Sequence, residues 1–229
     1  GTTFTLTLTQ TDATAYSSGN IAIVTPGMGT FTIDQGAGGT GIDRYDDMMP
    51  TAWEETTGTA LGTGIQNVNG AAGSTNIEWG LSADMLPDGM SAYIAISPRA
   101  TGTKATDKAS SSGAEGTKMA YDIAVATTGL ADGLNVFGGY SVTETDEPAA
   151  VKSGDRNQRV LGATYAVGSV TVGYQWSKDN ANNSAAASTA FYENDIFGVS
   201  FAVNDDLSIS YGLQRSDRQL ANHTNVEAE

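Results

Sequence analysis

The chain has 229 residues, no cysteine, 28 glycines and a formal net charge of −15. The lack of cysteine excludes a disulfide framework, a thiolate metal site and a thiol nucleophile, and the negative charge argues against nucleic acid as a partner. A transmembrane helix is excluded because no apolar run reaches about 18 residues, whereas strands that cross a membrane are apolar on one face only.

Apolar and polar residues alternate along most of the chain, which is the pattern of strands with two unlike faces. The predicted strands are 4–9 ("FTLTLT"), 20–25, 29–35 ("GTFTIDQ"), 75–84 ("TNIEWGLSAD"), 91–97, 118–126, 133–143, 159–166, 169–178 ("SVTVGYQWSK"), 195–203 and 207–215. This is about eleven strands. Helical periodicity is absent, and only 46–56 could hold a helical turn or two.

The connections between these strands alternate strictly between short and long. Short turns lie at 26–28, 85–90, 127–132, 167–168 and 204–206, and long polar links lie at 10–19, 36–74, 100–117, 144–157, 179–191 and from 216 onward. All long links therefore fall at one end of the sheet, as in an antiparallel up-and-down transmembrane β-barrel. A Greek-key sandwich would place long connections at both ends.

The two faces of the strands differ in a way that also favours a barrel. The less apolar face carries Thr, Ser, Gly, Ala, Asn and Gln with few charges, which suits the wall of a water-filled pore, whereas a soluble sheet exposes many charged side chains. The candidate pore-lining residues are Asp34, Glu78, Lys118, Asp122, Thr171, Gln175 and Ser210. The apolar face adds aromatic residues that suit a membrane-interface girdle, although they could also cap a soluble core: Trp79, Tyr121, Tyr140, Tyr165, Tyr174, Trp176 and Tyr211. Closure into a barrel is expected, since unpaired sheet edges are costly in lipid.

The longest link, 36–74, concentrates acidic residues among apolar ones. A loop of this length usually has a function, and the glycines after strand 29–35 allow a sharp turn. We interpret it as a loop folded into the pore, with Tyr45, Met48, Met49 and Trp53 packed around the candidate constriction residues Asp43, Arg44, Asp46, Asp47, Glu54 and Glu55. Five carboxylates offset by one arginine predict a preference for cations. The alternative is an acidic external loop that only keeps the surface soluble.

The segments "GTFTIDQG", "VLGATYAVGSVTVGYQWS" and "IFGVSFAVNDDLSISYGLQRSD" resemble the general porins of Gram-negative bacteria, particularly the alphaproteobacterial type. The resemblance extends over the whole chain, residues 1–229, as a single barrel domain. It implies a sixteen-stranded barrel of which both natural ends are missing here, with 36–74 as the constriction loop. It also implies an outer-membrane homotrimer in contact with lipid and lipopolysaccharide, through which ions and small hydrophilic solutes diffuse passively.

Other features are weaker. Lys118 and Arg99 are candidates for a basic wall opposite the loop, whereas Arg159 has the parity of the lipid side. A divalent cation such as calcium could bind among the loop carboxylates, but no calcium-loop motif is present and no cofactor is expected.

The only histidine, His223, stands alone, and no catalytic motif is present, so we do not expect an enzyme. The alternative function is that of an acidic structural or adhesive β protein of the cell surface, such as a surface-layer or fibre domain.

Overall fold

The alternating segments form β-strands, and the computed structural model has one sheet of twelve strands with neighbours in chain order from β1 to β12. The structure describes residues 1–9, 18–51, 68–98, 117–145, 154–186 and 188–228. All neighbouring strands pair antiparallel. The strands are β1 (Thr3–Thr9), β2 (Ser18–Thr25), β3 (Gly29–Gln35), β4 (Asn76–Leu81), β5 (Met90–Ser97), β6 (Thr117–Thr127), β7 (Leu134–Thr145), β8 (Arg156–Val167), β9 (Val170–Asn180), β10 (Thr189–Asn204), β11 (Leu207–Leu220) and β12 (Asn225–Ala228). The predicted all-β, up-and-down antiparallel fold is confirmed.

Several strands continue further toward the long loops than the alternation indicated. β10 begins at Thr189, six residues before its predicted start, and β11 continues to Leu220 before a tight turn leads into β12. The prediction of a long link from 216 onward is therefore wrong. In these extensions the regular alternation of apolar and polar residues has ended, as in the run Ser216, Asp217, Arg218 and Gln219 of β11, but the backbone pairing continues.

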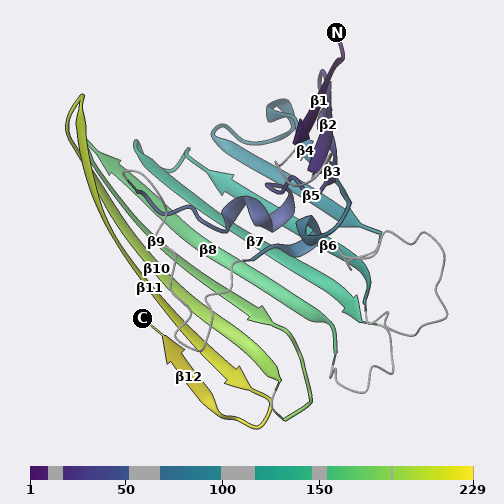
Figure 1. Ribbon diagram of the computed structural model, residues 1–229. Coiled ribbons are helices and arrows are strands. Elements are labelled where there is room, and N and C mark those ends of the chain that lie inside the picture. The colour runs from purple at the N-terminus through teal and green to yellow at the C-terminus, as the bar shows by residue number, and fades with distance from the viewer. Residues whose placement is uncertain (10–17, 52–67, 99–116, 146–153, 187, 229) are drawn as a thin grey trace.

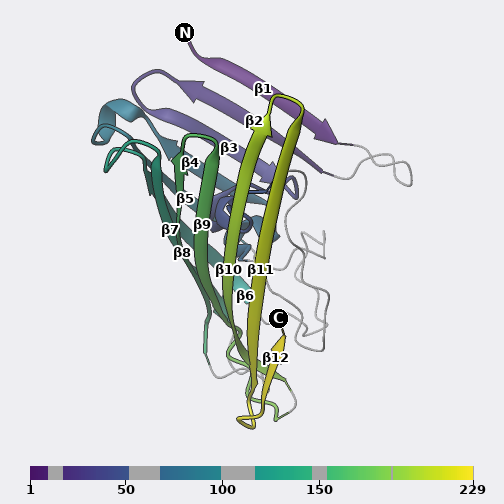
Figure 2. The ribbon, with the colours of Figure 1, turned by 90° about the vertical axis from the view of Figure 1, so that its left-hand side faces the viewer.

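The sheet is strongly curved, and the described parts of the loop that follows β3 lie on its concave side (Figures 1 and 2). This loop contains two short 3-10 helices, η1 (Gly41–Tyr45) and η2 (Gly70–Gly73), and a third, η3 (Ala83–Met85), lies in the turn between β4 and β5. Among the described residues, no helix is both long and apolar enough to cross a membrane.

Burial in this sheet is inverted relative to a water-soluble protein, in which apolar side chains are buried and charged ones are exposed. The concave face buries polar and charged side chains such as Asp34, Asn76, Asp122 and Asn194. The convex face exposes large apolar side chains on nearly every strand, including Ile77, Ile94, Ile123, Leu161, Val172, Phe197 and Ile209. An apolar surface this extensive requires lipid or another protein to cover it.

The predicted girdle residues lie on this convex face. Tyr121, Tyr140, Tyr165, Tyr174 and Tyr211 are exposed, so they do not cap a core of this chain. The two tryptophans of the predicted girdle have acceptors for their indole N–H groups: Trp79 donates to the Met28 carbonyl oxygen at 2.7 Å and Trp176 to Glu193 Oε1 at 3.0 Å. Beyond Trp176 the convex face becomes charged, with Lys178 and Glu193 forming an ion pair of 2.8 Å. The apolar band therefore ends before the long loops begin.

Candidate functional site

The loop 36–74 approaches the concave face through two described arms, residues 36–51 and residues 68–74. In the first arm η1 contacts β5, β6, β7 and β8, and in the second arm η2 contacts β5, β6, β7 and also η1. The two ends of the loop are therefore packed against each other and against the same three strands, β5, β6 and β7.

Apolar packing fixes the first arm above β7 and β8. Ile42, Tyr45 and Val68 from the two arms are buried against Phe137 and Val160 of the strands. The rings of Tyr45 and Phe137 have centroids 5.0 Å apart. Ile42 lies directly over Gly139, where an added Cβ would be only 2.5 Å from Ile42 Cγ2. This is the close approach that a glycine inside a strand allows.

Three acceptors on the strands receive backbone N–H groups from the loop. Asp122 Oδ2 accepts from Ile42 N at 3.1 Å and from Ala71 N at 2.9 Å, so this carboxylate bridges the two arms. Glu78 Oε2 accepts from Gly41 N at 2.6 Å, and Gln158 Oε1 accepts from Gly70 N at 2.7 Å. The first N–H groups of a helix lack acceptors within it, and here the wall of the sheet supplies them for both η1 and η2.

The bridge at Asp122 requires glycine on both sides. Gly41 and Gly70 have φ angles of +57° and +47°, and a Cβ would lie 2.0 Å and 2.2 Å from Asp122 Oδ2. Side chains are therefore excluded at both positions by backbone conformation and by space.

The charged side chain of Arg44 makes its contacts with residues of the site itself. Its guanidinium lies 3.4 Å from the centroid of the Tyr93 ring and forms an ion pair with Glu78, and its Nε donates to the Gly41 carbonyl oxygen at 3.1 Å. The Arg44 side chain is 18% exposed and that of Glu78 is 6% exposed. Because the two charges neutralise each other, Arg44 does little to offset the other loop carboxylates.

The remaining acidic residues of the first arm lie close together. Asp43 Oδ2 accepts from Gly39 N at 2.6 Å, and burial raises the pKa of Asp43. Burial, together with the neighbouring carboxylates of Asp47 and Asp43, raises the pKa of Asp46 to about 7. Asp47 is exposed. The negative charge of this arm therefore changes in the neutral pH range, which is unusual for aspartate.

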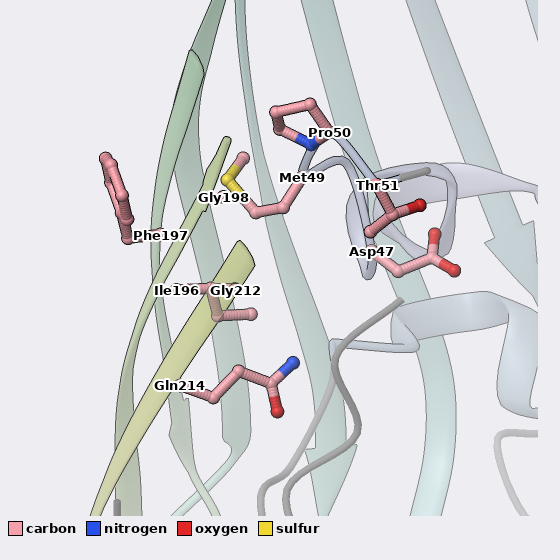
Figure 3. A pocket seen from close by; sticks show the side chains of 9 residues that line it. All are labelled: Asp47, Met49, Pro50, Thr51, Ile196, Phe197, Gly198, Gly212 and Gln214. Atoms are coloured by element: carbon pink, nitrogen blue, oxygen red, sulfur yellow. The ribbon is translucent and has the colours of Figure 1, made fainter. Parts of the chain in front are cut away.

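The first arm then crosses to β9, β10 and β11. The Gln175 amide donates to the Asp46 carbonyl oxygen at 3.0 Å. Beyond it, Met49 and Pro50 lie over Gly198 and beside a small pocket that Gly212 and Gln214 also line (Figure 3).

The residues predicted to line the pore differ in how far they are buried. Asp34, Glu78, Asp122 and Gln175 face the concave side, as their parity indicates, but they are buried rather than open to a channel. Thr171 and Ser210 face the same side and are not covered in this way. The side chain of Lys118 in β6 lies outside the described part of the chain, as do Trp53, Glu54, Glu55 and Arg99.

Several residues of the concave face did not stand out in the sequence. Arg156 forms a bidentate pair with Asp179, at 2.8 and 2.6 Å, near the long-loop end. Gln158 holds the second arm. The sequence placed Arg156 in the long link 144–157, and only the parity of the following residues, continued backward into that link, would have assigned it to this face.

The structure predicts which positions a water-soluble thiol reagent can reach. Cysteines at Thr171 and Ser210 should react with a membrane-impermeant maleimide, whereas cysteines at Val172 and Ile209 on the convex face should not when the protein is in lipid. A cysteine at Gln175 should react slowly, because that side chain is buried beneath the first arm. Mass spectrometry of the labelled variants measures this, and equal labelling of both faces would contradict the assignment of the two faces.

Comparison with known proteins supports the fold. A solved structure of a porin matches this chain with a TM-score of 0.56 and 14% sequence identity, over 99% of this chain and 78% of that chain. No family model matches the chain, and no curated protein matches its sequence. At this identity the match establishes a porin-like barrel fold and nothing finer.

Proposed function

We propose that the chain forms a water-filled channel for the passive diffusion of ions and small hydrophilic solutes across a bacterial outer membrane. The observation that carries the proposal is the loop 36–74, whose acidic first arm is held by hydrogen bonds on the polar concave face of a sheet with an apolar convex face. A membrane barrel has this arrangement of faces. The proposal includes a homotrimer of the alphaproteobacterial porin type, in contact with outer-membrane lipid and lipopolysaccharide.

We further propose that the channel prefers cations. Arg44 is paired with Glu78, so Asp43, Asp46 and Asp47 leave a local excess of negative charge. Charges beside a narrow passage with low-dielectric walls concentrate counter-ions there. A loop-bound divalent cation stays a prediction: among the described residues no group of three or more acidic or histidine side chains is arranged to hold a metal ion.

Planar-bilayer recording tests this function. The purified protein should produce stepwise increases in conductance, and in a salt gradient the zero-current potential should have the sign of cation preference. Protein that inserts into the bilayer without conducting would contradict the channel. Extraction distinguishes this channel from the alternative, a surface-layer or fibre protein. A chelator should release such a protein from the cell surface without detergent.

A further inference from the structure

Three glycines lie side by side on the concave face beneath the end of the first arm. Gly198 of β10 is directly opposite Gly173 of β9 and Gly212 of β11. The rows on either side carry side chains: Gln175, Ile196 and Gln214 on one side, and Thr171, Ser200 and Ser210 on the other. The three glycines therefore form a shallow channel in the wall, which we call the glycine groove.

Met49 and Pro50 occupy this groove. A Cβ at Gly173 would lie 2.7 Å from Pro50 Cδ and 3.0 Å from Met49 Sδ, and a Cβ at Gly198 would lie 3.0 Å from Met49 Cβ and from the Pro50 carbonyl oxygen. Carbon atoms in contact prefer separations of about 3.5–4.0 Å. A methyl group at either position would therefore have to displace the loop by up to about 1 Å.

Neither Gly173 nor Gly198 needs to be glycine for its backbone conformation, since neither is among the residues with positive φ. Glycine inside a strand lowers stability, because it costs backbone entropy and supplies no side chain for packing. The remaining explanation for the three aligned glycines is that they leave space for the loop on the concave face of the sheet.

We infer that the glycine groove determines the cross-section of the channel by setting how close Met49 and Pro50 lie to the wall. This inference rests on the proposed channel function and assigns a size-determining role to residues that lie beneath the loop. Side chains added to the groove push the first arm toward the lumen, so the passage narrows while its charged groups stay the same.

The test uses Gly173→Ala and Gly173→Val in planar bilayers. We expect a partial loss of single-channel conductance that is larger for valine than for alanine, with the zero-current potential unchanged. Valine is a good strand former, so the order of the two losses is opposite to that expected from strand propensity alone. Gly138→Ala is the matched control, because Gly138 lies in β7 and the three atoms nearest to its added Cβ would belong to Val160 and Leu161 of β8 and not to the loop.

Rescue distinguishes loop displacement from general damage. Pro50→Ala removes the Cδ atom that lies closest to the new methyl group, so Gly173→Ala combined with Pro50→Ala should return the conductance to that of Pro50→Ala alone. The inference would be overturned if the conductance of Gly173→Ala equalled or exceeded that of the parent. It would also be overturned if Pro50→Ala did not relieve the loss of conductance.

A second readout does not depend on conduction. In detergent, the methyl NMR signal of Met49 should shift in Gly173→Ala, while the signals of Met28 and Met85, which lie in the short turns, should not. If the parent protein fails to conduct, the proposed function is wrong, and the Met49 signal alone decides the groove: a shift supports the packing, and an unchanged signal overturns it.

Discussion

Replacing Asp122 with alanine should release both arms of the loop at once. The substitution removes the acceptor of Ile42 N and of Ala71 N, which are 29 residues apart in the chain and meet at one carboxylate oxygen. A buried N–H left without an acceptor costs about 1–3 kcal/mol. Amide hydrogen exchange at both residues should therefore accelerate by roughly tenfold to a hundredfold. Single-channel recordings should show fluctuation between conductance levels in place of one steady level.

Asp122→Asn is the matched control, because its side-chain oxygen can still accept both hydrogen bonds. We expect its exchange rates to stay close to those of the parent. Gly41→Ala and Gly70→Ala should behave like Asp122→Ala, since either methyl group would strike the same carboxylate. Faster exchange in one arm only would show that the arms are held independently, and the bridging role would then be wrong.

The cation preference should weaken as the pH falls from about 8 to about 6. The pKa of Asp46 is raised to about 7 by burial and by Asp47 and Asp43, so its carboxylate is charged above this range and neutral below it. Ordinary aspartates, with pKa values near 4, stay ionised throughout. Because the neutral form tolerates burial better, the docked arm should also be most stable below about pH 4, the ordinary range of aspartate, and lose that stability as the pH rises to about 7.

Zero-current potentials measured across this pH range give the test, and Asp46→Asn is its control. The variant should show a weaker preference that no longer changes between about pH 6 and 8. A full set of amide substitutions at Asp43, Asp46, Asp47, Glu54 and Glu55 should shift the potential further toward anions, with a smaller effect on conductance. The parent's preference should fade toward ~1 M salt. If the set of five substitutions leaves the ion preference intact, the loop does not select ions.

The sequence predicted the strands where apolar and polar residues alternate regularly, and it missed strand residues where that alternation ends. The regular alternation in 169–178 gave β9 almost completely, whereas β12 was missed because "NVEA" shows no apolar face beyond Val226. The loop stood out through its length and its carboxylates. Its attachment did not stand out, because two strands of the sheet lie between the loop and Asp122 in β6, and four lie between the loop and Gln158 in β8. The same limit applies to the glycine groove: each glycine is visible in the sequence, but their alignment is a property of β9, β10 and β11 together.

The long-range contacts of the loop imply an order of assembly. Neighbouring strands pair through short sequence separations, but Ile42 bonds to a residue 80 positions later and Gly70 to one 88 positions later. Contacts between distant segments form late because the intervening chain must first be ordered. The loop therefore cannot take its final position until β6, β7 and β8 have paired. During folding the sheet should pass through a stage in which its polar interior is open and wet, and docking of the loop should be the last step to complete the structure.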